Sequence, residues 1–345
     1  MKKNILINRL VRFIIIAACP VLLNSCLMEY PEMTENGEIG IDPTLVTVNA
    51  VVSVDLGSSE AGNVDLDSRL EEKIYKHRIV VAAYEGRELR AQKIIYEDKP
   101  LTNRLQTEVK LELHARKYTL VTWVDYYCED ENPIYDIYTD QGLILIRKGN
   151  NNYLGNSEYK KAYYSSEELD LTEYKDRWGE TVPVEVKTIS PMIRYELVAT
   201  DVQKFLDNNP HTESIQLTLT YNDYVPTGFN ALDGITKEAF KFQSFSRTIK
   251  RPENNPKELS LLFDYVFVDD VRSRNSVSPL SVTLKVEDVT DPNKKVELAS
   301  STFNLVFQNT VNEKITFDFL TTKPGDGVDV DTDFGGNAEV EVPVE

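Results

Sequence analysis

Side chains that could perform catalysis follow no catalytic spacing in this chain. The 56 Asp and Glu residues could supply a pair of acids for general acid and base work, but no separation can be read from a sequence. The three histidines, His77, His114 and His211, stand in no H-E-x-x-H pattern, and we expect each of them at the surface. The chain has no G-x-S-x-G elbow, no phosphate-binding glycine loop and no dinucleotide fingerprint. We therefore expect neither enzymatic activity nor a cofactor.

A group of alternating acids near the end of the chain raises the question of calcium. Asp329, Asp331 and Asp333 have the spacing of the first ligands of an EF-hand loop. Such a loop would need a glycine where Phe334 stands and a glutamate where Val340 stands. We expect a solvated acidic loop and no metal, with an irregular calcium site as the open alternative.

One cysteine has a setting that predicts chemistry, namely attachment of a lipid. Cys26 ends the stretch Leu23–Cys26, which follows a basic N-terminus and the apolar run Phe13–Leu23. This layout is typical of a secretory signal, and the stretch itself is similar to a bacterial lipobox. Cleavage before Cys26 would leave its thiol to carry a lipid such as palmitate; the alternative is an ordinary signal peptide with a chance cysteine. Cys19 leaves with the signal, and Cys128 is expected to be a buried small hydrophobe.

Charge and composition restrict the partners. The formal net charge is −18 and the isoelectric point is about 4.7. An acidic chain repels phosphate backbones and anionic lipid head groups, which argues against nucleic acid as a partner. A link to the membrane should therefore be covalent. The chain after the signal has no other long apolar run and is large enough for about two domains.

Hydrophobic periodicity predicts an all-β protein with one or two short helices. Short β-branched segments alternate with turn residues, as in β-sandwich domains. A capping box, with Thr200 at the cap and Gln203 three residues on, predicts a helix that ends at Asn208–Pro210. Between Tyr126 and Asp176 we expect a tyrosine-rich, mostly irregular stretch. The expected strands are Thr44–Val54, Arg78–Tyr84, Gln92–Tyr96, Glu108–His114, Tyr118–Asp125, Leu143–Ile146, Val182–Val186, Met192–Val198, Ser214–Tyr221, Phe240–Ile249, Glu258–Val268, Leu280–Val286, Lys295–Phe307 and Lys314–Phe319.

The terminal segment has an unusually regular pattern. After Gly335–Gly336, the apolar residues Ala338, Val340, Val342 and Val344 alternate with glutamate and proline. Period two predicts a strand with one apolar face and one acidic face. It is either an edge strand of its own domain or a donor strand that completes a groove in a neighbouring subunit. The predicted layout is a signal (1–25), a tether (26–43), two β-sandwiches (44–189 and 190–336) and this strand (337–345).

Four sets of residues stand in order after the lipobox: Tyr118–Tyr126, Asn152–Asn156 with Ala162–Tyr164, Ile189–Asp201 and Val306–Thr321. In this order and beside the lipobox, they resemble landmarks of the fimbrillin-like lipoproteins of Bacteroidetes. The resemblance implies two transthyretin-like β-sandwich domains and a subunit of the type V pilus, either the main pilin or an accessory subunit. The departure from the family pattern is the final segment, Ala338–Val344.

The resemblance also implies a maturation and assembly route. Such subunits reach the cell outer membrane as lipoproteins, and a protease cuts after an arginine in the first domain. Here Arg69 lies in a turn-rich loop between the first two strands. The cut releases the first strand, and the groove takes a strand from the next subunit, for which Val340, Val342 and Val344 are the candidate contacts. Expected partners are other pilus subunits, the outer membrane through the lipid at Cys26, and a host or bacterial surface ligand. A stalk, tip or anchor position stays open.

The rival interpretation is a glycan-binding surface lipoprotein. Tyrosine rings stack on sugar rings, but tyrosine is also common in half-buried strands and at protein interfaces. A glycan-binding protein gains nothing from a detachable terminal strand, whereas a polymer subunit needs one. The tyrosines that would form the platform are Tyr126, Tyr127, Tyr135, Tyr138, Tyr153, Tyr159, Tyr163 and Tyr164.

Overall fold

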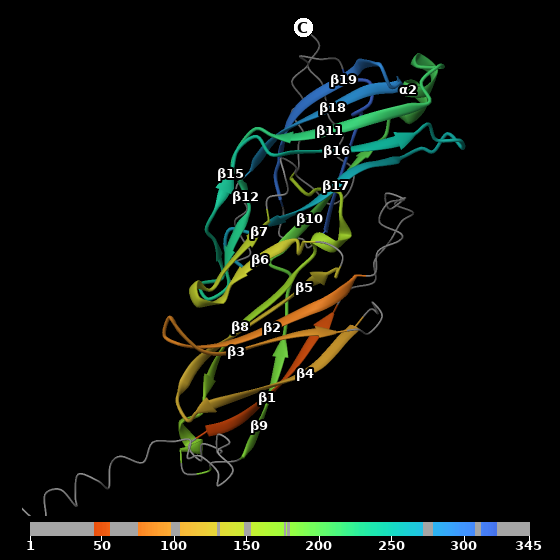
Figure 1. The fold of residues 1–345 in the computed structure, drawn as a ribbon. Helices are drawn as coiled ribbons and strands as arrows, with labels where there is room; N and C mark the ends of the chain where they lie inside the picture. The colour runs from red at the N-terminus through yellow and green to blue at the C-terminus, as the bar shows by residue number, and fades with distance from the viewer. Residues whose placement is uncertain are drawn as a thin grey trace, which may run out of the picture.

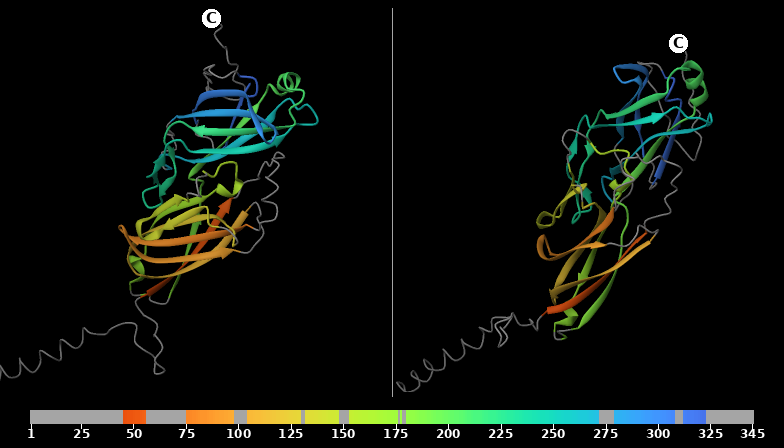
Figure 2. Two further views of the ribbon diagram at one scale, coloured as in Figure 1. Left: turned by 45° about the horizontal axis from the view of Figure 1, so that its top comes forward. Right: turned by 45° about the vertical axis from the view of Figure 1, so that its right-hand side comes forward.

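The chain folds into two β-sandwiches stacked one above the other in an elongated molecule (Figures 1 and 2). The structure is a computed structural model and describes residues 45–55, 75–97, 104–129, 132–147, 153–175, 177, 180–271, 279–307 and 312–322. Within these residues β-strands dominate, and α2 (Val202–Asn208) is the only α-helix. The prediction of an all-β protein with sandwich domains is confirmed. Short 3-10 turns are η1 (Thr139–Gln141), η2 (Glu158–Lys160) and η3 (Thr172–Tyr174).

The first sandwich, in the lower half of Figure 1, pairs a three-stranded with a four-stranded sheet. The strand orders are β4-β1-β9 and β3-β2-β5-β8. In β4, Val109, Leu111 and Leu113 are buried while the residues between them face solvent, because alternate side chains of a strand point to opposite faces. The bounds are β1 (Leu45–Asp55), β2 (Lys76–Glu85), β3 (Glu88–Glu97), β4 (Arg104–His114), β5 (Lys117–Tyr127), β8 (Tyr163–Asp170) and β9 (Thr181–Lys187).

The second sandwich, in the upper half of Figure 1, has the same composition of sheets, ordered β17-β10-β20 and β16-β11-β18-β19. In β11, the buried Ile215, Leu217, Leu219 and Tyr221 alternate with half-buried polar residues. The bounds are β10 (Met192–Ala199), β11 (Ser214–Tyr221), β16 (Ser244–Lys250), β17 (Leu259–Phe267), β18 (Leu280–Asp291), β19 (Lys294–Leu305) and β20 (Asn312–Phe317).

The two sandwiches have the same connectivity. The first strand of each, β1 or β10, lies in the middle of the three-stranded sheet. It pairs antiparallel with β4 or β17 on one side, and parallel with β9 or β20 on the other. In each sandwich the parallel partner is also the last strand. The first strand therefore closes its sheet only when the end of the same domain has been reached.

A small sheet between the sandwiches combines strands from both halves of the chain. Its order is β14-β13-β7-β6, and a separate pair, β12-β15, lies beside it. At Gly228 the strands approach so closely that a Cβ atom would lie 2.8 Å from Cδ2 of Leu145, so any other residue would require that side chain to move. Because this sheet crosses residue 189, the division into 44–189 and 190–336 stays a prediction. The bounds are β6 (Tyr135–Tyr138), β7 (Leu143–Ile146), β12 (Val225–Pro226), β13 (Gly228–Asn230), β14 (Ile235–Thr236) and β15 (Ala239–Phe240).

The sheet of β2 and β5 is covered on both faces. Ile79 and Val81 of β2 belong to the core of the first sandwich. Their neighbours Val80 and Ala82 belong to a second core, which continues through the small sheet into the second sandwich. The two sandwiches are thus joined by a shared apolar core as well as by the chain.

Two local predictions are wrong. The stretch expected to be irregular contains a full strand, β8, which pairs with β5. The helix α2 is present, but the capping box is not: its N-cap is Asp201 and has no side-chain cap hydrogen bond. The hydroxyl of Thr200 instead donates to Asp318 at 2.8 Å, and the Gln203 amide donates to Asp207. Tertiary partners have displaced the local motif.

Candidate functional site

The first strand, β1, is held between two strands along almost its whole length. All 11 residues pair with β4, from Leu45 opposite His114 to Asp55 opposite Arg104, with no shift of register. On the other side, residues 47–53 pair with residues 181–187 of β9. We call the position that β1 occupies, with the facing edges of β4 and β9 and the side chains beneath, the β1 slot. The β1 slot offers one extended strand a pairing edge on each side.

The face of β1 that points into the sandwich consists only of valine and alanine. The side chains of Val46, Val48, Ala50, Val52 and Val54 are all 0% exposed. Burying four valines contributes about 6–12 kcal/mol relative to leaving them in water. They pack against β2, β5 and β8 of the facing sheet, whose core residues include Ile79, Val81, Leu120, Val124 and Tyr163. No side chain of β1 on this face carries a polar group.

The opposite face of β1 is half-buried, and two of its side chains make polar contacts with β4. The hydroxyl of Thr47 donates to Oε1 of Glu112 at 3.0 Å, and the amide of Asn49 donates to Oε2 of Glu108 at 3.3 Å. Exposed contacts of this kind contribute little to stability. β1 is therefore held in the β1 slot by backbone pairing and by small apolar side chains at every second position.

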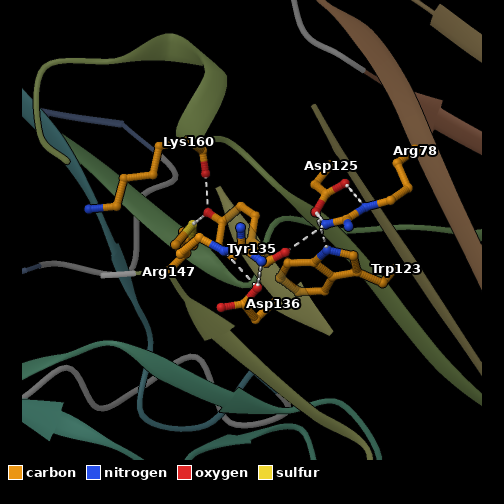
Figure 3. A network of polar contacts seen from close by, with 8 residues as sticks. Arg78, Trp123, Asp125, Tyr135, Asp136, Arg147 and Lys160 are labelled. Carbon is orange, nitrogen blue, oxygen red and sulfur yellow. Dashed lines mark hydrogen bonds and ion pairs between the residues drawn. The ribbon is translucent and has the colours of Figure 1, made fainter. Parts of the chain in front are cut away.

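A buried polar network lies where the first sandwich meets the small sheet (Figure 3). Nε of Arg78 donates to Oδ1 of Asp125 at 2.9 Å, and Nη2 of Arg78 donates to the backbone oxygen of Tyr135 at 3.0 Å. The indole N–H of Trp123 donates to the same carboxylate at 3.1 Å. Burial raises the pKa of Asp125, an effect that the Arg78 guanidinium opposes. These contacts orient β2, β5 and β6 relative to one another.

A second buried ion pair connects η2 to the middle of β17. Nζ of Lys160 lies 2.7 Å from Oδ1 of Asp264, and both side chains are 0% exposed. Nζ also donates to the hydroxyl of Tyr153 at 2.7 Å, and the hydroxyl of Tyr221 donates to Oδ2 of Asp264 at 2.8 Å. Tyr135 donates to the backbone oxygen of Lys160, which Figure 3 shows. Burial lowers the pKa of Lys160, while Asp264 opposes that shift.

Sequence reasoning missed both ion pairs, although each leaves a signal. Asp264 is a lone acid inside the run Leu261–Phe267, and Asp125 is the one charged residue between Tyr118 and Tyr127. A charge inside a buried strand is rarely tolerated without a partner. The partners themselves, Arg78 and Lys160, lie 47 and 104 residues away and could not be identified without the fold.

Residues 43–343 match the family described as "Family of unknown function (DUF6562)". The chain belongs to this family. The match spans both sandwiches and includes every strand from β1 to β20. Among curated proteins, none matches the chain.

Solved structures that match the chain include three from Bacteroides species. A candidate adhesin of Bacteroides ovatus is 10% identical, with a TM-score of 0.43 over 82% of this chain and 89% of that chain. A candidate cell adhesion protein of Bacteroides eggerthii is 10% identical, with a TM-score of 0.42 over 83% and 92%. A candidate polysaccharide-binding protein of Bacteroides thetaiotaomicron is 11% identical, with a TM-score of 0.41 over 80% and 92%. At these scores the similarity by itself carries no argument about function.

The site residues predicted for this DUF6562 chain lie outside the described residues. This holds for Cys26, for Arg69 and for the acids Asp329, Asp331 and Asp333. It also holds for Val340, Val342 and Val344 of the terminal segment. Arg69 falls between β1 and β2 in the sequence, as expected from the predicted strands. These assignments stay predictions.

The expectation of three surface histidines is wrong for one of them. His114 and His211 are exposed, but His77 is only 1% exposed. It lies on β2, whose two faces are both covered, and its ring packs against Tyr126 with 4.8 Å between centroids. Neither ring nitrogen has a hydrogen-bond partner among the described residues. Burial lowers the pKa of His77 from 6.5 to about 4, against the opposing effect of Glu97.

Other expectations about reactive groups can be placed in the fold. Cys128 is buried and free, as predicted. Over the described ranges, no cluster of three or more His, Cys, Asp or Glu side chains could hold a metal ion. In the same ranges, no helix has the length and apolarity needed to cross a membrane.

The tyrosine-rich stretch does not form a single aromatic surface. Tyr135, Tyr163 and Tyr164 are buried, and Tyr153 is engaged by Lys160. Of the eight tyrosines proposed for stacking on sugars, only Tyr138 is exposed, at 44%. Most of these rings pack inside the molecule instead, for example against Trp123, Phe229 and Tyr221.

Proposed function

We propose that this chain is an exported, lipid-anchored surface protein that serves adhesion as a structural subunit of a fimbrium, without catalysis. Subunits would be joined by strand addition: β1 is removed after cleavage at Arg69, and a neighbouring subunit inserts a strand into the β1 slot. The observation that carries the proposal is the position of β1. It is central in its sheet, paired on both edges without a register shift, and buried by small apolar side chains alone.

The place of Arg69 in the sequence supports removal of β1. Residues 56–74 form the connection between β1 and β2, and among the described residues β1 is the only element on the N-terminal side of it. After a cut at Arg69, β1 would be held by noncovalent contacts alone. Main-chain pairing and the valine face would then be available to any strand of the same pattern.

The terminal segment has the pattern that the slot requires. The core face of β1 reads Val46, Val48, Ala50, Val52, Val54, and the segment offers Ala338, Val340, Val342 and Val344 at the same spacing. If the donor runs in the direction of β1, placing Ala338 at the position of Ala50 puts Val340 and Val342 at the positions of Val52 and Val54. In that register Glu339 and Glu341 take the half-buried positions of Val51 and Ser53, on the face of β1 that also carries Thr47 and Asn49.

The glycan-binding alternative receives less support, because most of the tyrosine rings on which it depends are buried or half-buried against other side chains of the molecule. The ring of Tyr96, which is 50% exposed, lies against the half-buried ring of Tyr127 with 4.7 Å between centroids, but Tyr96 lies outside the tyrosine-rich stretch. An adhesin at a pilus tip could still bind a sugar. That binding would be additional to subunit assembly.

The proposal is tested on protein recovered from the cell surface. Intact mass and N-terminal sequencing should give a new N-terminus at Leu70, and gel electrophoresis without boiling should give a ladder of polymers. A variant ending at Gly336 should lose the ladder. Val342→Asp should also lose it, because it places a charge in the slot, whereas Glu341→Gln on the opposite face of the same strand should retain it.

A lipidated, uncut monomer that is indifferent to truncation and to Val342→Asp would overturn a stalk role and strand exchange at the β1 slot. The subunit would then be an anchor or a glycan-binding lipoprotein. Binding of the uncut monomer to a glycan array would favour the second of these.

A further inference from the structure

The pair of Lys160 and Asp264 combines features that go beyond a structural ion pair. Both side chains are fully buried, and Nζ lies 2.7 Å from Oδ1. The two residues are 104 positions apart, on η2 and in the middle of β17. An amine and a carboxyl group are thus held in contact inside the core. Such a pair is oriented for a condensation reaction.

Hydrogen-bond partners surround both groups of the pair: donors contact the two carboxylate oxygens, and an acceptor contacts the amine. The hydroxyl of Tyr221 donates to Oδ2 of Asp264 at 2.8 Å. The hydroxyl oxygens of Tyr221 and Tyr195 lie 2.5 Å apart. The backbone N–H of Tyr265 donates to Oδ1 at 2.8 Å. On the amine side, the oxygen of Tyr153 accepts from Nζ at 2.7 Å, with its ring centroid 4.1 Å from Nζ. The carboxylate is therefore polarised on both oxygens.

We propose that Lys160 and Asp264 form an intramolecular isopeptide bond, an amide between Nζ and the Asp264 side-chain carbonyl. The ammonium first passes a proton to Oδ1, which gives a neutral amine and a neutral acid. Nζ then attacks Cγ, and the charge that develops on Oδ2 is stabilised by the Tyr221 hydroxyl. A second proton moves from Nζ to Oδ1, the Cγ–Oδ1 bond breaks, and one water leaves. No oxidant, metal or other reactant is needed.

The burial of the pair favours this reaction in two ways. A buried charge pair carries a desolvation cost, and a neutral amide removes both charges from the core. Burial also lowers the pKa of Lys160, so more of the amine is in the nucleophilic form than on the surface. Expulsion of the product water from an apolar core leaves the amide without a hydrolysing molecule beside it.

The other buried ion pair provides an internal comparison. Arg78 and Asp125 are also in contact, with Nε 2.9 Å from Oδ1, and also lie among aromatic side chains. A guanidinium remains protonated in proteins, so it does not become a nucleophile in this way. The bond is therefore expected at one pair and not at the other, although the burial is similar.

The experiment is peptide mapping of the full chain by mass spectrometry after denaturation and trypsin digestion. A linked chain gives one branched peptide, in which residues 149–161 are joined to residues 258–272, lighter than the two parts by one water, about 18 Da. Trypsin does not cut after an acylated lysine, so residues 149–160 should not appear as a free peptide. Free peptides 149–160 and 258–272 at their unmodified masses, with no branched peptide, would overturn the proposal.

Two variants make the assignment specific. Lys160→Arg keeps the positive charge but should yield only separate peptides. Asp264→Asn should give the same branched peptide, now with loss of ammonia, about 17 Da, relative to its own two parts. A branched peptide that persists in Lys160→Arg would place the bond elsewhere and overturn the assignment. The wild-type map decides the proposal even if a variant fails to fold, and its result does not depend on whether the chain polymerises.

Discussion

The two sandwiches share one strand order, yet they hold their first strands by different means. β1 pairs with β4 without interruption and fills its slot with valine and alanine only. β10 has a register shift between Leu197 and Val198 where it pairs with β17, and its Tyr195 hydroxyl joins a buried hydrogen-bond network. After β10, the Asp201 carboxylate accepts hydrogen bonds from the backbone of Leu320 and Thr321. β10 is fixed at a defined register, whereas β1 is held by a repeated pattern.

The same topology can therefore hold its first strand in two ways, which differ in how many other sequences could take the place of that strand. A strand fixed by a bulge and by a specific polar contact can be replaced only by a close copy of itself. A strand held by backbone pairing and uniform apolar packing can be replaced by any strand with the same alternation. Under the proposed function, strand exchange takes place in the first sandwich, and β10 stays in the second.

The largest expected effect comes from placing a charge under each first strand. Val48→Asp and Leu197→Asp both bury an unpaired carboxylate at a position that is 0% exposed, which costs about 4 kcal/mol or more. Val48→Asp should release β1 and raise hydrogen exchange in β4 and β9, while the second sandwich stays protected. Leu197→Asp should expose both sandwiches, because Leu197 belongs to the shared core. Equal, global exchange in both variants would contradict the independent role of β1.

The next effect tests the junction that both sandwiches use. Asp125→Ala leaves the Arg78 guanidinium buried without its partner and should reduce the free energy of unfolding by about 3–5 kcal/mol. The double variant Arg78→Met, Asp125→Leu should recover most of that loss. Denaturant unfolding, followed by tryptophan fluorescence, measures both. A single variant that loses under 1 kcal/mol would mean that the pair does not organise this junction.

A smaller effect concerns the dependence of stability on pH, which His77 introduces in the first sandwich. The folded-state pKa of His77 is lowered to about 4, so between about pH 6.5 and 4 the unfolded chain binds a proton that the folded chain does not. Stability should therefore fall as pH decreases through this window, by about 2–3 kcal/mol. His77→Phe should flatten the dependence of Tm on pH. Because His114 and His211 are exposed, His211→Phe in the second sandwich should leave that dependence unchanged.

The smallest expected effect concerns the exposed contacts beside the two first strands. Thr47→Val removes the hydrogen bond to Glu112, and Thr200→Val removes the one to Asp318. Each should change the free energy of unfolding by about 0.5 kcal/mol or less. A loss above 1.5 kcal/mol for Thr47→Val would show that the polar face of β1 contributes to its recognition.

Local pattern was enough to locate most strands. β7 and β11 were predicted with the bounds that they have, because their apolar residues alternate or run continuously between clear turns. Cys128 was predicted to be buried for a different reason: with no disulfide or metal role available to it, a free cysteine behaves as a small hydrophobe. Strand β8 was missed because its burial follows no period: Tyr163, Tyr164 and Ser165 are all buried in succession. It is an edge strand whose two faces contact different cores.

The misses at the candidate site have tertiary causes. His77 was expected at the surface because it stands in no metal-binding motif, but β2 is covered on both sides. No local signal reports that a second core will cover the outer face of a sandwich. For the same reason, the pairing of β7 with β13 and the contact of Lys160 with Asp264 could not be foreseen. They join residues that only the stacking of the two halves brings together.

The parallel pairing of β1 with β9 also sets an order of events during folding. Thr47 is paired with Thr181, so the first sheet closes only after more than a hundred residues have emerged. Contacts so distant in sequence form late, because the entropy of closing the loop must be overcome first. The antiparallel partner, β4, is nearer in sequence, so β1 is expected to dock first on β4 and to remain open along its other edge. The strand that begins the fold is thus among the last to be locked, and a chaperone or protease would meet it unprotected.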